Sequence, residues 1–224
     1  MSNVLHIIQA GGIMMFPLLL LSFAAVAVIV ERWLTYQEAA FIPKGLLDRV
    51  LRLCESRRFE EAIGICEMKE GPVAASLAAV VRWRSMGAPN VERKVQEVGE
   101  SYFIRLEKFL PMLDTTTTVS PLLGLLGTLF GMIGTFQAIA ASKSQASNDT
   151  VLAGVGEALY ATATGLSVAV LCFVAYNYFS ARQRAAVSET EQSATKLINA
   201  LIEQGDLTND EVVPQPVGRV LGAV

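Results

Sequence analysis

One acidic residue, Glu157, lies in an otherwise apolar stretch of the sequence, "GVGEALYATATGL" at residues 154–166. A charged side chain in a membrane-spanning helix costs about 2.5–3.5 kcal/mol on insertion-based scales. Acids retained in such helices usually face a bundle interior or a cavity and mark a path for protons or ions. We therefore predict a proton pathway at Glu157. The alternative is a membrane-boundary position, where lipid headgroups solvate the carboxylate.

Threonine hydroxyls accompany this acid. Thr164 follows Glu157 by seven residues and shares its side of an ideal helix, whereas Thr162 is turned away by about 140°. Thr128 and Thr135 lie seven residues apart in the preceding apolar segment. Hydroxyl groups both donate and accept hydrogen bonds, so they can order water along a pathway. Plain hydrogen bonding to the backbone of their own helices is the alternative.

Small residues recur in the same two segments at helical spacing. The first series has intervals of 3, 4 and 3, and the second has intervals of 4: Gly124, Gly127, Gly131 and Gly134; Ala161, Gly165 and Ala169. Because lipid gives helices no hydrophobic reason to associate, close approach through small residues holds them together. We predict helix packing at these positions. A nucleotide loop is excluded, because the glycines do not form a GxGxxG or GK[ST] pattern.

These residues belong to a chain with three candidate membrane spans. Residues 13–30, 119–141 and 151–178 are each long and apolar enough to cross a bilayer, which needs about 20 residues per helix. The chain is 52% hydrophobic and 17% charged. The sequence therefore predicts an all-α membrane protein with three transmembrane helices.

The positive residues predict its orientation. None of the 18 Lys and Arg residues precedes the first span, thirteen lie between the first and second spans, and one lies between the second and third. The positive-inside rule then gives a periplasmic N-terminus and a cytoplasmic C-terminus. The predicted segments outside the spans are a periplasmic start (1–12), a cytoplasmic helical domain (31–118), a periplasmic hairpin (142–150), a cytoplasmic helix (179–205) and a flexible cytoplasmic tail (206–224).

The cytoplasmic segments have the apolar spacing of helices. Residues 44–70 repeat apolar positions at helical intervals, and Gly71-Pro72 and Gly87-Ala88-Pro89 are expected breaks. From residue 90 a charged amphipathic helix is expected to run toward the second span, with Pro111 and Pro121 as positions for a kink. These helices form the long cytoplasmic extensions of the predicted fold.

Several classes of function are excluded by composition. The net charge of −3 does not suggest a nucleic-acid partner. Cys54, Cys66 and Cys172 are expected to be free thiols, and His6 is the only histidine. Their spacing predicts no metal site. No nucleophile–base pair or cofactor loop stands out, so we expect neither an enzyme nor a bound cofactor.

The sequence also resembles a known family. The blocks "SPLLGLLGTLFGMIGTF" and "GEALYATATGL", in this order and spacing, resemble the ExbB, TolQ and MotA proton-channel family, and the ExbB and TolQ branch in particular. The resemblance is sharpest over residues 120–182. It covers the three-span layout with a large cytoplasmic loop.

That resemblance implies a homopentamer around a central lumen formed by the second and third spans. Single-span partners of the ExbD or TolR type would lie in the lumen, and proton flow would drive a TonB- or TolA-type transducer that reaches the outer membrane. By the family pattern, Thr128 and Thr162 match lumen threonines and Glu157 matches the intramembrane glutamate. Thr164 stands where relatives often have an apolar residue.

Two other functions stay open from the sequence. A MotA-type flagellar stator is one, although such proteins usually have four spans and a larger cytoplasmic domain. A non-conducting membrane scaffold is the other, with Glu157 at the interface. The leading hypothesis is the proton-channel subunit of a complex in the bacterial inner membrane.

Overall fold

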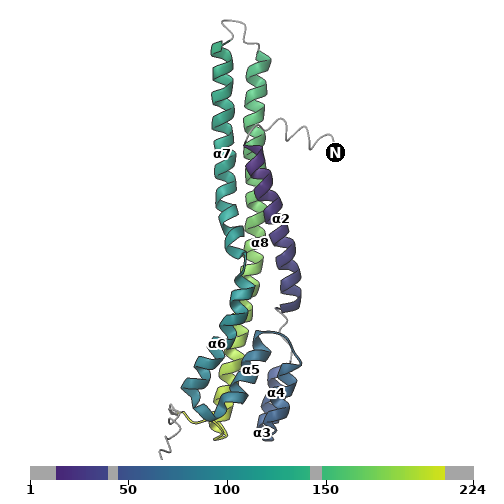
Figure 1. Cartoon of the computed structure of the whole chain (residues 1–224), viewed down its shortest axis with the longest axis vertical. Coiled ribbons are helices and arrows are strands. Elements are labelled where there is room, and N and C mark those ends of the chain that lie inside the picture. Colours follow the sequence, from purple (N-terminus) through teal and green to yellow (C-terminus); the bar gives the residue numbers. More distant parts are fainter. Residues whose placement is uncertain (1–13, 40–44, 142–147, 210–224) are drawn as a thin grey trace, which may run out of the picture. The chain divides into compact units, whose positions relative to one another are not determined.

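The computed structural model describes residues 14–39, 45–141 and 148–209, and every regular element among them is a helix (Figure 1). This confirms the all-α prediction for the part of the chain described. The predicted N-terminal segment lies outside these residues, as do most of the hairpin and the tail from residue 210. The helices form two compact units. Unit 1 comprises Met1–Leu34 and Lys108–Ser180, and unit 2 comprises Thr35–Glu107 and Ala181–Val224.

Unit 1 contains the apolar parts of three helices, α2 (Met15–Ala39), α7 (Leu110–Ala141) and α8 (Asn148–Glu203). In Figure 1 the three lie side by side. Three helical stretches of the described chain are long and apolar enough to cross a membrane, one through each of these helices. The prediction of three membrane-spanning helices is therefore confirmed by length and composition.

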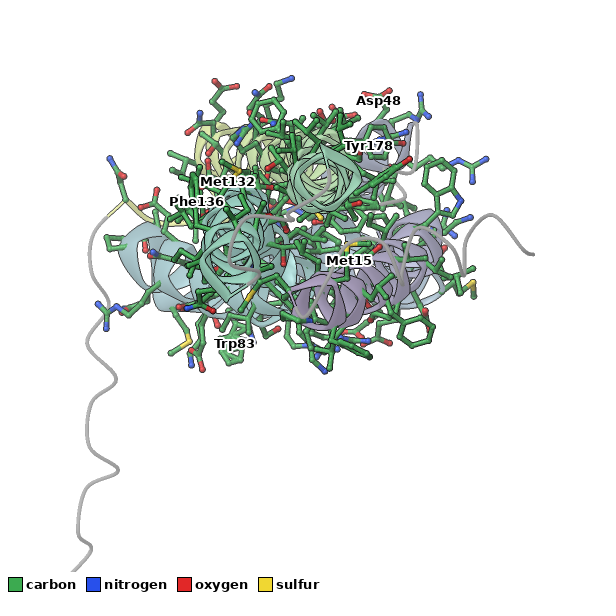
Figure 2. The ribbon with its side chains drawn as sticks, turned by 90° about the horizontal axis from the view of Figure 1, so that it is seen from above. Met15, Asp48, Trp83, Met132, Phe136 and Tyr178 are labelled. Atoms are coloured by element: carbon green, nitrogen blue, oxygen red, sulfur yellow. The ribbon has the colours of Figure 1, made fainter. Side chains whose placement is uncertain are left out.

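Large apolar side chains cover the outside of unit 1. In the most apolar 18 residues of each of the three stretches, only 28%, 17% and 33% are buried within the chain. Phe136 of α7 and Tyr178 of α8, both exposed, are labelled in the view along the helices in Figure 2. A water-soluble protein rarely exposes so much contiguous apolar surface. Lipid or further protein must therefore cover these helices.

Unit 2 has a conventional apolar core. It is formed by α3 (Leu46–Glu55), α4 (Phe59–Glu67), α5 (Pro72–Trp83), a short 3₁₀ helix (Arg84–Met86), α6 (Ala88–Glu107) and the C-terminal part of α8. Helix α5 is buried on nearly every side, and Leu77, Val80 and Val81 are in the core. Leu197 and Leu201 of α8 complete it.

Glycines separate the short helices of unit 2. Gly71, at φ 137°, precedes Pro72 at the first position of α5, and Gly87, at φ 82°, precedes α6. These are the two breaks that the sequence predicts, and each backbone angle is one that a side chain disfavours. Residues 45–70 contain two helices, α3 and α4, because the chain turns at Arg57, which has φ 58°.

The helix expected from residue 90 toward the second span is interrupted close to Pro111, one of the two kink positions that the sequence predicts. Helix α6 ends at Glu107, Phe109 adopts φ 66°, and α7 begins at Leu110. Pro111 explains the break, because proline has no N–H for the carbonyl four residues earlier, that of Glu107, and its ring clashes with it. Pro111 fits instead in the first turn of α7. Pro121 lies inside α7 without ending it.

Candidate functional site: the contact of α7 with α8

Small residues of α7 and α8 face one another in unit 1. On α7 these are Gly124, Gly127 and Gly131, and on α8 they are Gly154, Ala158, Ala161 and Gly165. A Cβ atom placed on Gly127 would lie 2.7 Å from the Cβ of Ala161, and one on Gly131 would lie 3.2 Å from the Cβ of Ala158. We call these seven residues the small-residue contact.

The backbones of α7 and α8 approach each other closely at Gly165. A Cβ atom there would lie 2.5 Å from the carbonyl oxygen of Ser120 and 3.1 Å from the Cα of Gly124. Side-chain atoms essentially never approach a backbone oxygen so closely, so something would have to shift. Glycine at position 165 therefore permits the close approach of α7 and α8, in the manner of small-residue interfaces in membranes.

Two predicted packing positions, Gly134 and Ala169, are not among these seven residues; Ala169 is buried, and Gly134 is not. A Cβ atom on Gly134 would have no neighbour within 4 Å, and the residue is exposed. Gly154 and Ala158 take part although sequence reasoning did not select them. Their signal was present, since positions 154, 158, 161 and 165 repeat small residues at intervals of 4, 3 and 4.

The predicted pathway threonines use their hydroxyls in two ways. Thr162 donates a hydrogen bond across the contact to the carbonyl of Gly124, at 3.2 Å. Thr128 donates to Leu125 at 2.7 Å and Thr164 donates to Tyr160 at 2.8 Å, each within its own helix. Thr162 thus ties α8 to α7, while the other two hydroxyls satisfy carbonyls of their own backbone. All three side chains are partly accessible in the single chain.

Glu157 lies in helix α8, three residues after Gly154 and one residue before Ala158. Its side chain is outside the described part of the structure, so the direction of its carboxylate stays a prediction. The backbone position is nevertheless defined: Glu157 belongs to the turn of α8 that packs on Gly131.

A buried hydroxyl adds a polar group to the same contact. Ser120 of α7 is fully buried, and its Oγ has no hydrogen-bond partner within the described residues. Its carbonyl oxygen is the atom nearest to the Cβ position of Gly165. An unpaired buried hydroxyl is costly in an apolar environment. It therefore marks a point where a water molecule or a polar partner group would be favourable.

Aromatic and charged groups gather near the C-terminal end of α2. Trp33 stacks on Tyr178 of α8, with ring centroids 5.9 Å apart. Arg32 is only 2% exposed, pairs with Glu31 at 2.5 Å and lies 5.6 Å from the centre of the Phe109 ring. Trp and Tyr are enriched where helices leave the membrane. These residues indicate one edge of the membrane-spanning part of unit 1.

The cysteines do not contribute to this site. Cys54, Cys66 and Cys172 are free and buried. Burial raises the pKa of the Cys54 thiol to about 11, and burial together with nearby Cys54 and Glu67 raises that of Cys66 to about 12. The residues that the structure describes contain no group of three or more His, Cys, Asp or Glu side chains that could hold a metal ion.

Comparison with known proteins places this arrangement in a family. Residues 72–192, which include α7 and the membrane part of α8, match the MotA/TolQ/ExbB proton channel family. The chain is 30% identical to putative biopolymer transport protein ExbB-like 3 of Synechocystis sp. over 185 residues, 81% of this chain and 88% of that protein.

Two further relatives match different portions of the chain. The Tol-Pal system protein TolQ of Pseudomonas aeruginosa is 46% identical over 78 residues, 35% of this chain and 33% of that protein. Biopolymer transport protein exbB1 of Vibrio cholerae is 25% identical over 177 residues, 76% of each chain. The chain therefore belongs to the MotA/TolQ/ExbB proton channel family and is most similar to its ExbB and TolQ branch.

Proposed function

We propose that this protein is the proton-channel subunit of an inner-membrane complex that converts the proton motive force into work at the outer membrane. The observation that carries the proposal is the family match, which runs without interruption through both helices of the small-residue contact and through Glu157. The work is TonB-dependent uptake or Tol-Pal envelope maintenance. The partners are an ExbD- or TolR-type single-span protein and a TonB- or TolA-type transducer.

The uncovered surface of unit 1 supports an oligomer. The α7–α8 pair is held together inside one chain, yet α7 remains largely exposed. We propose that copies of this pair surround a lumen as a homopentamer, with the N-terminus periplasmic and the C-terminus cytoplasmic. Closed rings of this kind form when one surface of a protomer binds a different surface of its neighbour.

Glu157 would give each copy one acid in the lumen, and five copies would form an acidic ring. Rings of carboxylates favour cations in channels. Each proton that crosses releases about 2.3 kcal/mol per 100 mV of membrane potential, which is enough to bias the position of a partner helix. Thr128 and Thr164, which are partly accessible, would order water beside the ring. Thr162 would hold α8 at a fixed rotation against α7.

The test is proton flux in liposomes that contain this protein and its ExbD- or TolR-type single-span partner from the same organism. Glu157→Gln and Thr128→Ala are expected to leave co-purification of the partner intact while flux falls at least tenfold. Thr118→Ala is the matched control, because Thr118 is an exposed α7 threonine that also donates to its own helix. Full flux in both pathway variants would overturn the proposal and favour a non-conducting scaffold.

A further inference from the structure

Unit 2 contains a groove of about 570 Å³ between α6 and α8. Apolar residues of both helices form much of its lining: Val95, Gly99, Phe103, Val187, Ala194 and Ile198. Three carboxylates stand along it, Glu92 and Glu100 on α6 and Glu191 on α8. Among the described residues that line it, none is Lys or Arg. The groove therefore has an apolar floor and acidic edges.

Its carboxylates are not neutralised within the chain. Glu92, Glu100 and Glu191 are exposed and make no ion pair or hydrogen bond with the residues that the structure describes. On the same α6 helix, by contrast, Glu97 pairs with Lys94 at 2.7 Å. Three unpaired charges of one sign beside an apolar surface create a potential that attracts a positively charged partner.

Gly99 keeps the groove open. A Cβ atom at this position would lie 3.2 Å from the ring of Phe103, so a side chain there would displace the ring or fill the groove. Behind Gly99 lies Ser76 of α5, whose fully buried hydroxyl has no hydrogen-bond partner in the described residues and is 3.8 Å from the same Cβ position.

We propose that this groove binds a basic amphipathic segment of the single-span partner subunit. The inference rests on the proposed function, which supplies that partner and places unit 2 in the cytoplasm. The cytoplasmic flank of a membrane span is rich in Lys and Arg. An amphipathic helix lays its apolar side into a groove of this kind. Between Glu92 and Phe103, α6 rises about 17 Å, which matches three turns of a bound helix.

The chain's own C-terminal residues suit the groove less well. Residues 210–224 contain Asp210, Glu211 and a single cation, Arg219. Their net charge is negative, so the acidic edges would repel more of this segment than they attract. Anionic lipid is disfavoured for the same reason. A basic amphipathic segment suits the groove better, because its Lys and Arg residues match the acidic edges and its apolar side matches the floor.

The experiment uses the full-length protein and its partner in detergent, with a photocrosslinking residue at Thr195, a polar position in the groove lining. Crosslinking to the partner's cytoplasmic segment is expected. Reversing the groove charges (Glu92→Lys, Glu100→Lys and Glu191→Lys together) is expected to reduce that crosslink at least tenfold. The matched control carries Glu97→Lys and Glu189→Lys, on the same helices but outside the groove lining, and should retain it.

A second measurement does not depend on identifying the partner segment. A fluorescent helical peptide of leucine and lysine, about 18 residues long with its lysines on one face, is titrated onto the wild type. Its affinity is expected to fall at least tenfold with reversed groove charges and also with Gly99→Leu. Circular dichroism of each variant checks that unit 2 remains folded.

Two results would overturn the inference. One is a crosslink from position 195 to a second copy of this chain, and the other is equal crosslinking by the groove variant and the control. Either could occur while Glu157→Gln still abolishes proton flux, and the proposed function would then stand without the groove. If the wild-type protein did not co-purify with the partner at all, both the groove inference and the proposed function would be contradicted.

Discussion

The two units stabilise helices by different means. Unit 2 buries large side chains, such as Leu77 and Leu197, in a closed apolar core. The α7–α8 contact of unit 1 does the reverse, with glycine and alanine at the contact and large side chains such as Phe23 and Leu122 outside. In water, burial of apolar surface drives packing. In lipid that gain disappears, and close backbone approach with interhelical hydrogen bonds takes its place.

This difference has a consequence for function. A helix pair fastened by glycines leaves its bulky faces free for lipid, for neighbouring copies and for a partner helix. In unit 2 most bulky apolar side chains are already buried in its own core, and the proposed partner contact is limited to the groove between α6 and α8. Unit 1 is therefore the part of the chain suited to assembly within the membrane, and unit 2 the part that folds around its own core.

The largest expected effect comes from removing one core side chain. Leu77→Ala in unit 2 should destabilise the protein by about 2–5 kcal/mol, the usual range for a buried leucine replaced by alanine. Leu20→Ala makes the same chemical change on α2, where Leu20 is 71% exposed. It should have a much smaller effect. Thermal unfolding in detergent, followed by circular dichroism, measures both. Equal losses would contradict the distinction between the units.

The next effect comes from adding a methyl group at the small-residue contact. Gly165→Ala places a Cβ atom 2.5 Å from the Ser120 carbonyl and should cost about 1–3 kcal/mol, the range for overpacked sites. Gly134→Ala is the matched control, because it meets no atom within 4 Å. Resistance of the helix pair to dissociation in increasing SDS is the measurement. A fully tolerated Gly165→Ala would show that close approach is not essential.

A smaller effect is expected from the hydrogen bond across the contact. Thr162→Val removes the donor to Gly124 while preserving shape and should cost about 0.6–2 kcal/mol. Thr162→Ser keeps a hydroxyl and should restore most of the loss. Thr128→Val, which loses only a bond within its own helix, should change stability less. The same SDS titration compares the variants. A larger loss for Thr128→Val than for Thr162→Val would contradict the role given to Thr162 in the contact.

Much of this architecture follows from the sequence, because it depends on local chemistry. The three spans are visible as apolar runs, and the spacing of Gly124, Gly127 and Gly131 predicts one packing face. The α6–α7 break lies beside Pro111, a position that the sequence marks for a kink, because Pro111 has no N–H to donate to the carbonyl of Glu107 in a continuous helix. Of the two prolines marked for a kink, only Pro111 coincides with a break, since Pro121 lies inside α7.

Other features depend on how helices rotate against each other, which spacing alone does not determine. The sequence shows that Thr162 is turned away from Glu157, but only the structure shows that it meets Gly124. Gly134 shares the glycine spacing yet lies outside the contact. The acidic groove of unit 2 brings together α6 and α8 residues about 90 positions apart in the sequence, so no local pattern reveals it.

The last prediction concerns the thiols in the core of unit 2. Their reactivity tests whether that core is closed, and their effect on stability is the smallest expected. At pH 8, Cys54 and Cys66 should resist alkylation by N-ethylmaleimide, because burial raises their pKa to about 11 and about 12 and the thiolate is the reactive form. Met68→Cys, at an 83% exposed position of unit 2, should be labelled within minutes. Mass spectrometry of peptides from each cysteine gives the result.

The same pKa shifts determine how unit 2 responds to alkali. A thiol whose pKa is higher in the folded than in the unfolded state stabilises the fold below the unfolded pKa of about 8.5, and this contribution is lost as pH rises above it. Unit 2 should therefore become less stable between about pH 8.5 and 12, the folded-state pKa of Cys66, and Cys66→Ala should reduce that slope. Rapid native labelling of Cys66 at pH 8 would show that water and reagent enter the core. Unit 2 would then lack the closed interior that distinguishes it from unit 1.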